Sequence, residues 1–153
     1  MDGVCSLATT KANLTTVVSG ACDGEVRIWD LSDQTTVRSH AKAHAGFVRG
    51  LTCSRGGDVL VSCGDDKLIK LWRLGGEGEG EEEEEEDESS VLLSTIYGKN
   101  AFVGVDHAWE GTTFATVGGT VVEVWDHHRN KPVHKFSWGT ASPTAVPSPL
   151  TPP

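Results

Sequence analysis

Short stretches of apolar and polar residues, separated by turn residues, follow one another along almost the whole chain. Val26-Arg27-Ile28 alternates apolar and polar side chains, as a half-buried β-strand does. Asp23-Gly24 lies between two such stretches, and a glycine there supplies the positive φ that a tight hairpin turn requires. No helical periodicity of useful length is present. The pattern therefore predicts an all-β protein built from short antiparallel strands.

The predicted strands fall into three groups of four. Inner strands are expected at Val4–Ala8, Val48–Cys53 and Phe102–Val105. Second strands are expected at Val17–Ser19, Val59–Ser62 and Thr113–Val117, and third strands at Val26–Trp29, Leu68–Trp72 and Val121–Trp125. Outer strands are expected at Thr36–Ser39, Val91–Ile96 and Val133–Ser137.

Internal repetition explains this grouping. Ser19–Asp30 and Ser62–Arg73 align without gaps, and Thr116–Asp126 is a third copy. Trp29 and Trp72 are 43 residues apart, and an acidic insertion lengthens the next interval. A period near 43 with a Trp-Asp ending is the signature of WD40 repeats, which have four strands per blade. We expect a partial β-propeller, an incomplete ring over residues 2–138 with three blades at about 2–40, 44–97 and 101–138.

Four polar and aromatic residues of the second repeat have the spacing of the WD40 structural tetrad: His44, Ser62, Asp66 and Trp72. The expected hydrogen bonds run from the indole through the hydroxyl and the imidazole to the carboxylate. A fully paired buried network stiffens its surroundings. A hydrolytic triad is the alternative, but it needs an exposed serine nucleophile beside a cleft and an oxyanion site. We therefore expect no enzyme activity, and no catalytic residue is assigned.

The other two repeats carry partial tetrads. The first has Ser19, Asp23 and Trp29, but its histidine would precede Met1. The third has Thr116 and Trp125, with Gly119 where the turn aspartate belongs, so a looser blade is expected.

The net charge of −9 is concentrated in one segment. Residues 77–88 hold most of the excess carboxylates, and all 13 Lys and Arg residues lie outside that segment. Residues 75–90 are expected to be a disordered acidic insertion, with an arm that attracts basic protein tails or repels RNA as the sharper alternative. Residues 139–153 are expected to be a disordered proline-rich tail, with an SH3-type ligand as the alternative.

The remaining chemistry-bearing residues predict no metal site and no cofactor. Cysteines 5, 22, 53 and 63 form no C-x-x-C pair and are expected to be reduced thiols. His107, His127, His128 and His134 lack a third ligand at suitable spacing and are interpreted as incidental surface residues. Basic residues on the third strands are interpreted as a solvated face rather than a nucleic-acid site. No apolar run reaches the length of a membrane span, so no membrane association is expected.

Several strings resemble one particular family. GACDGEVRIW, HAGFVRG and VDHAW, with the acidic insertion between the last two, are similar to the suppressor-of-fibrillarin type of WD-repeat protein over about residues 2–139. The resemblance implies a nuclear and nucleolar scaffold in the small-subunit processome, where proteins of a ribonucleoprotein complex mature 18S ribosomal RNA. It implies protein partners, indirect contact with RNA and no small-molecule substrate. The same resemblance implies about seven blades, so a three-blade fragment is expected.

The resemblance also implies an alternative function as substrate receptor of a cullin-4 ubiquitin ligase. That function is associated with a box ending in Trp-Asp-x-Arg. Asp23, Trp29 and Asp30 match the box, but Ser32 stands where Arg or Lys is expected. In the third repeat His128 takes that place and Arg129 comes one residue late.

Overall fold

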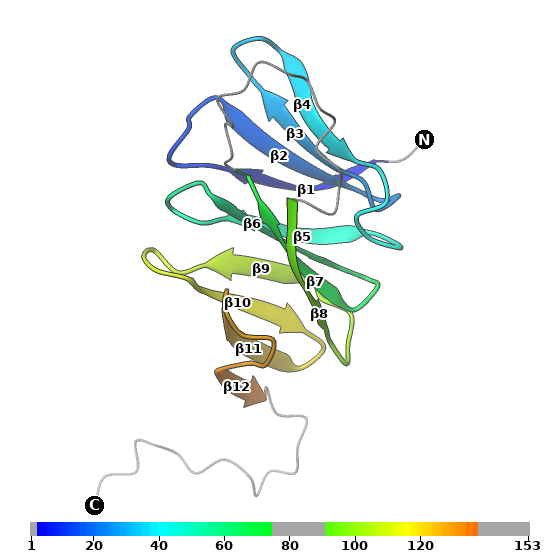
Figure 1. The fold of residues 1–153 in the computed structure, drawn as a ribbon. Helices are drawn as coiled ribbons and strands as arrows, with labels where there is room; N and C mark the ends of the chain where they lie inside the picture. The colour runs from blue at the N-terminus through cyan, green and yellow to red at the C-terminus, as the bar shows by residue number, and fades with distance from the viewer. Residues whose placement is uncertain (1–2, 75–90, 138–153) are drawn as a thin grey trace, which may run out of the picture.

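Twelve strands form three separate four-stranded sheets in the computed structural model, which describes residues 3–74 and 91–137 (Figure 1). The first sheet contains β1 (Val4–Thr9), β2 (Thr16–Ala21), β3 (Val26–Asp30) and β4 (Thr35–His40). The second contains β5 (Val48–Cys53), β6 (Val59–Gly64), β7 (Leu68–Arg73) and β8 (Leu92–Tyr97). The third contains β9 (Gly104–His107), β10 (Thr113–Gly118), β11 (Val121–Asp126) and β12 (His134–Ser137).

The predicted fold class is confirmed: each sheet is an antiparallel meander of four strands in chain order. The predicted start of the third inner strand, at Phe102, is wrong. β9 begins at Gly104 rather than Phe102, because the N–H of Phe102 donates to the carbonyl of Gly64 in the second sheet, 3.1 Å away. The Phe102 side chain is buried against that sheet. The insertion 75–90 and the tail 139–153 lie outside the described residues.

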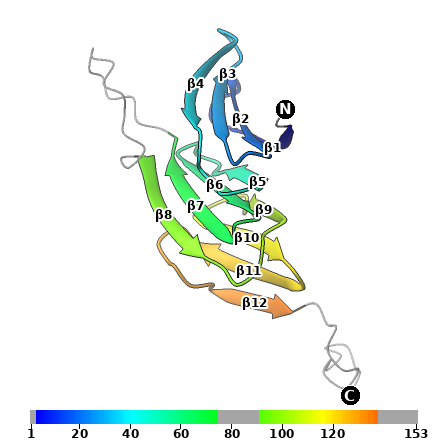
Figure 2. The same ribbon diagram turned by 90° about the vertical axis from the view of Figure 1, so that its right-hand side faces the viewer.

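The three sheets are stacked one after another in an arc (Figure 2). β1 packs against β5, and β5 packs against β9, so the first strand of each sheet lies on the inner side. β4, β8 and β12 form the other edge of their sheets. The described residues make no closed ring. This is the arrangement expected of consecutive propeller blades.

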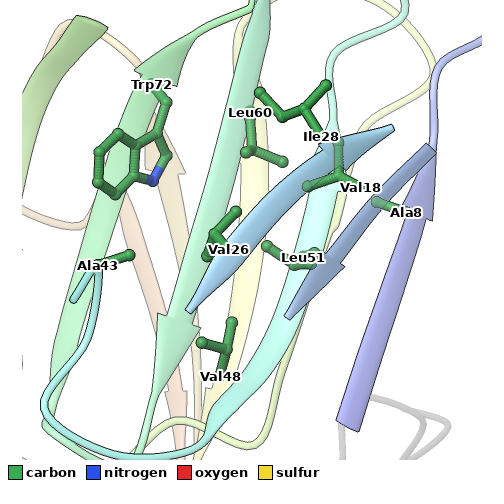
Figure 3. Packing of buried hydrophobic residues seen from close by; sticks show 9 residues of the cluster. All are labelled: Ala8, Val18, Val26, Ile28, Ala43, Val48, Leu51, Leu60 and Trp72. Carbon is green, nitrogen blue, oxygen red and sulfur yellow. The ribbon is translucent and has the colours of Figure 1, made fainter. Parts of the chain in front are cut away.

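The hydrophobic core lies between the sheets rather than within one of them. Figure 3 shows the first cluster, in which Val18, Val26 and Ile28 of the first sheet pack against side chains of the second sheet: Val48, Leu51, Leu60 and Trp72. The second cluster joins the other face of the second sheet to the third sheet through Phe102, Phe114 and Trp125. Because successive side chains of a strand point to opposite faces, Leu60 serves one cluster and Val61 the other.

Close approach of neighbouring sheets requires glycine on the inner side. A Cβ atom on Gly20 would lie 2.6 Å from Cγ1 of Val48, and one on Gly50 would lie 2.9 Å from Cγ1 of Val105. Gly20 therefore lets β5 approach the first sheet, and Gly50 lets β9 approach the second. A β-bulge interrupts the pairing of β5 with β6 between Val48 and Gly50, next to this contact.

Candidate functional site

The structure brings His44, Ser62, Asp66 and Trp72 into one hydrogen-bonded chain. The Trp72 indole donates to the Ser62 hydroxyl oxygen at 2.9 Å, and the Ser62 oxygen is 2.7 Å from Nε2 of His44. Nδ1 of His44 lies 2.9 and 3.0 Å from the two carboxylate oxygens of Asp66. Since an ionised carboxylate only accepts, Nδ1 carries the proton and Nε2 accepts from the Ser62 hydroxyl.

Asp66 joins two segments that are far apart in the sequence. Its carboxylate accepts from the backbone N–H of Ala45 in the β4–β5 loop and from that of Leu68 at the start of β7, both at 3.1 Å. With the bond to His44, this side chain connects the loop before β5 to the turn between β6 and β7. Three bonds to one acidic side chain make this turn a rigid corner of the second sheet.

Burial of the chain removes it from substrate chemistry. Ser62 has no exposed surface, and His44 is 3% exposed. Burial lowers the pKa of His44, although the hydrogen bond and the charge of Asp66 act in the opposite direction. A neutral imidazole suits a hydrogen-bonded link between Asp66 and Ser62. The hydroxyl is buried and already engaged by Trp72 and His44, so it lacks the access to substrate that a nucleophile needs.

The first and third sheets contain the shorter versions that the sequence indicates. Trp29 donates to Ser19 at 2.8 Å, and Trp125 donates to Thr116 at 2.9 Å. In the first sheet Asp23 accepts from the backbone N–H of Glu25 and so closes its own turn. The Trp29–Ser19 and Trp125–Thr116 bonds involve no histidine. The tryptophan–hydroxyl bond is therefore shared by all three sheets, and the complete chain belongs to the second.

Trp29 and Asp30 of the candidate adaptor box lie at the end of β3, and Asp23 lies in the turn before that strand. Asp30 accepts from both the backbone N–H and the hydroxyl of Ser32, which closes a short turn after the strand. These bonds lower the pKa of Asp30, with the Ser32 hydroxyl as the largest cause. In the third sheet Asp126 accepts from the backbone N–H of His128 in the same way. In both turns the aspartate carboxylate accepts a hydrogen bond from the residue two positions later in the sequence.

A cleft of about 460 Å³ runs between the inner strands of all three sheets. We call it the inner-strand cleft. The ends of β1, β5 and β9 and the loops after them supply its walls: Leu7–Thr9, Lys11, Leu51–Cys53, Arg55 and Asp106–Trp109. Burial raises the pKa of the Cys53 thiol in this cleft to about 12, so it stays a thiol at neutral pH and is a poor nucleophile.

One side of the cleft carries a tryptophan flanked by two cations. Nζ of Lys11 lies 3.8 Å from the centre of the Trp109 ring, and Cζ of Arg55 lies 4.5 Å from it. Arg55 also donates to the carboxylate of Glu110 at 3.1 Å. The Trp109 side chain is 61% exposed. Each of the three follows the inner strand of a different sheet, so the cluster exists only when the three sheets are stacked.

The interpretation of His107 and His127 as incidental surface residues is wrong. Their Nε2 atoms are 2.8 Å apart, and both side chains are half-buried beside Phe114. His107 is further held by Thr52, whose hydroxyl oxygen is 3.2 Å from both its backbone nitrogen and Nδ1. Burial, followed by the charge of His127, lowers the pKa of His107 to about 4. His107 therefore bonds to Thr52 of the second sheet and to His127 within the third.

Sequence reasoning missed the Lys11–Trp109–Arg55 cluster, although a signal for it exists. The three residues follow the three inner strands, so aligning the repeats places them in equivalent loops. It also missed the contact of His107 with His127. The strand prediction placed His107 beyond the end of its inner strand, whereas β9 includes it and pairs it with Phe114.

The described residues, 3–74 and 91–137, contain no cluster of three or more His, Cys, Asp or Glu side chains suited to a metal ion. Within the same ranges, no helix has the length and apolar character needed to cross a membrane.

Comparison with known families identifies the repeat. The family model described as "WD domain, G-beta repeat" matches residues 2–30 and 34–73. It describes a structural repeat, and no enzyme family is indicated. Two solved structures share the fold: "Crystal structure of RRP9 WD40 repeats", with a TM-score of 0.73 at 19% identity, and "Structure of U3-55K", with 0.72 at 18%. Each alignment covers 88% of this chain, and 38% and 39% of those chains respectively.

Similarity in sequence is stronger to another group of proteins. The protein named DDB1- and CUL4-associated factor 13 is 40% identical in Dictyostelium discoideum and 43% identical in Homo sapiens, each over 145 residues. These alignments cover 95% of this chain. The chain spans 31% of the length of these relatives.

Proposed function

We propose that this chain, whose residues 2–30 and 34–73 match the WD40 repeat, acts as a non-catalytic scaffold in a ribonucleoprotein assembly, the nucleolar small-subunit processome that matures 18S ribosomal RNA. The observation that supports a binding role is the Lys11–Trp109–Arg55 cluster on the inner-strand cleft. Trp and Arg are the residues that most often dominate the energy of protein–protein interfaces. Here they lie at the surface, beside a cleft that a partner's side chains can enter.

The geometry of the cluster favours a partner with acidic side chains. Two cations share one indole ring, and Glu110 pairs with only one of them. A carboxylate from a partner therefore gains an ion pair with Lys11 while an apolar group packs on the exposed edge of Trp109. Such contacts set specificity and association rate more than affinity. In this proposal the contact with RNA is indirect, through the bound proteins.

The nucleolar part of the proposal rests on the family resemblance. The strings GACDGEVRIW, HAGFVRG and VDHAW carry it, and they contribute to β2, β3, β5 and β9 in the structure. Nucleus and nucleolus are accordingly the proposed location. The two solved structures support the propeller fold and add nothing to this location, because their sequence identity is low.

A second candidate function is supported by the names of the relatives. Proteins 40% and 43% identical to this chain are named for association with DDB1 and CUL4, which favours a substrate receptor of a cullin-4 ubiquitin ligase. In this chain Ser32 takes the place of the basic residue of the box, and its hydroxyl bonds to Asp30. That turn therefore presents a neutral, internally bonded side chain where the receptor role calls for a cation.

Affinity purification of the full chain from nucleolar extract tests both candidates. The scaffold role predicts co-purification of box C/D small nucleolar RNA and processome proteins, with the RNA lost when the proteins are removed by protease. Recovery of DDB1 and CUL4 without these components would support the receptor role instead. If Ser32→Arg creates DDB1 binding, the parent chain fails to bind DDB1 because it lacks a cation at this position.

A matched pair of charge reversals tests the binding surface. Lys11→Glu with Arg55→Glu changes two cations that follow inner strands, whereas Lys42→Glu with Lys99→Glu changes two exposed cations in the loops before inner strands. The first double variant should lose the co-purified proteins, and the second should keep them. Equal retention by both variants would exclude the cluster as the contact surface.

A further inference from the structure

Two cysteines that are distant in sequence are in contact in the first sheet. The sulfur atoms of Cys5 and Cys22 are 2.8 Å apart, within about 1 Å of the length of a disulfide bond. Neither is bonded to another cysteine. The sequence suggested no such pair, because the two residues are 17 positions apart and share no motif.

Strand pairing explains the contact. Val4 pairs with Ala21 and Ser6 pairs with Gly20, so Cys5 is the extra residue of a β-bulge in β1. A bulge bends its strand and redirects the side chain of the extra residue. The backbone N–H of Cys22 donates to the carbonyl of Gly3 at 2.9 Å and holds the start of the next turn against β1. Both backbones are therefore held in place by hydrogen bonds close to the two sulfur atoms.

The surroundings of the pair include a cation and admit a small reagent. Cys5 is exposed and Cys22 half-buried. The guanidinium of Arg49, on β5, interacts with the charge of both thiols, and its side chain is 40% exposed. Asp65 pairs with Arg49 at 2.9 and 3.1 Å and keeps it in position. A neighbouring cation promotes ionisation of a thiol, and the thiolate is the reactive form.

We propose that Cys5 and Cys22 are a site of reversible oxidative modification, at which a hydroperoxide converts the two thiols into an intramolecular disulfide. One thiolate attacks the peroxide oxygen and becomes a sulfenic acid, and hydroxide leaves. The second thiol attacks the sulfenic sulfur, the S–S bond forms, and water leaves. Overall two thiols and one hydrogen peroxide give one disulfide and two waters, the two electrons passing from the sulfur atoms to the peroxide.

The acidity of Cys5 suits the second of these steps. Loss of hydration, followed by the hydrogen bond and charge of Cys22, raises the pKa of Cys5 to about 11. Cys5 therefore stays protonated at neutral pH and supplies the second, resolving thiol. Cys53 and Cys63 serve as internal controls, because burial raises the pKa of each to about 12 and neither belongs to the close pair of thiols.

Peptide mapping of the full chain tests the proposal. Cleavage after Lys and Arg places the four cysteines on four different peptides, 1–11, 12–27, 50–55 and 56–67. After treatment with hydrogen peroxide and alkylation of free thiols, peptides 1–11 and 12–27 should be linked and separable by dithiothreitol. This link should exceed any other pairing by at least about tenfold, because groups held in contact react at high effective concentration.

Two single variants make the result decisive. Cys22→Ser should abolish the link, whereas Cys53→Ser should form the link as the parent chain does. Circular dichroism checks that both variants keep the sheet structure. The proposal is overturned if the parent chain keeps both thiols free to alkylate after peroxide, if Cys5 oxidises alone, or if the products are disulfide-linked dimers on a non-reducing gel.

Discussion

Replacing Ser62 with alanine tests how strongly the hydrogen-bonded chain stabilises the second sheet. The hydroxyl oxygen is 2.9 Å from the Trp72 indole nitrogen and 2.7 Å from Nε2 of His44, and all three side chains are buried. Alanine leaves two buried polar groups without this partner. Because each unpaired group costs about 1–3 kcal/mol, the free energy of unfolding should fall by roughly 2–6 kcal/mol.

The other two sheets supply graded controls for this measurement. Thr116→Val keeps the side-chain shape and leaves only the Trp125 indole unpaired, so the expected loss is about 1–3 kcal/mol. Ser19→Ala leaves the indole N–H of Trp29 without its acceptor, but this side chain is half-buried and can bond to water. Its cost should stay below about 1 kcal/mol. The predicted order of destabilisation is therefore Ser62→Ala, then Thr116→Val, then Ser19→Ala.

Urea unfolding of the full chain, followed by tryptophan fluorescence and circular dichroism, gives the three free energies. The slope of free energy against urea should be the same for parent and variants, since each variant leaves the buried surface nearly unchanged. If Ser62→Ala costs no more than Ser19→Ala, the chain through His44 adds nothing to stability. The hydrogen-bonded chain from Trp72 to Asp66 would then have no stabilising role in the second sheet.

Two further predictions concern a turn and a titration. Gly24→Ala should destabilise the chain by more than about 3 kcal/mol, because the new Cβ would lie 1.8 Å from the His44 carbonyl oxygen at a φ of +89°. Gly111 has a φ of +82° but open space around it, so Gly111→Ala should cost only about 1–2 kcal/mol. Thermal unfolding measures both. Similar losses for both would contradict the clash. The pKa of His107 is lowered by burial, then by His127, from 6.5 to about 4, so between these pH values the unfolded chain binds more protons. The free energy of unfolding should be fully retained above about pH 6.5 and decrease as the pH falls toward 4, by roughly 1–2 kcal/mol after allowance for solvent screening. His107→Asn should reduce the difference between the free energies of unfolding at pH 7 and pH 5, each measured by urea unfolding. An equal difference for the parent chain and the variant would contradict the attribution of this difference to His107.

The strand pattern was readable from the sequence because it is local. Alternation in β3 and the Asp-Gly turn before it depend on residues that are neighbours along the chain, and the repeat supplied three independent copies of the signal. β9 was the exception. Its start depends on the bond from Phe102 to the Gly64 carbonyl, which belongs to another sheet and leaves no trace in the local pattern.

The amino-acid sequence by itself determined the four-strand repeat, the fold class and the residues able to form the chain from Trp72 to Asp66, because each of these is encoded by spacing within one repeat. Only the tertiary structure decided which side chains meet across repeats. Lys11 and Arg55 reach Trp109, and His107 reaches Thr52, through the stacking of the sheets. Cys5 meets Cys22 through a bulge, which shifts the strand register by one residue. Such contacts depend on the distance between segments in space, which the periodicity of a single strand does not encode.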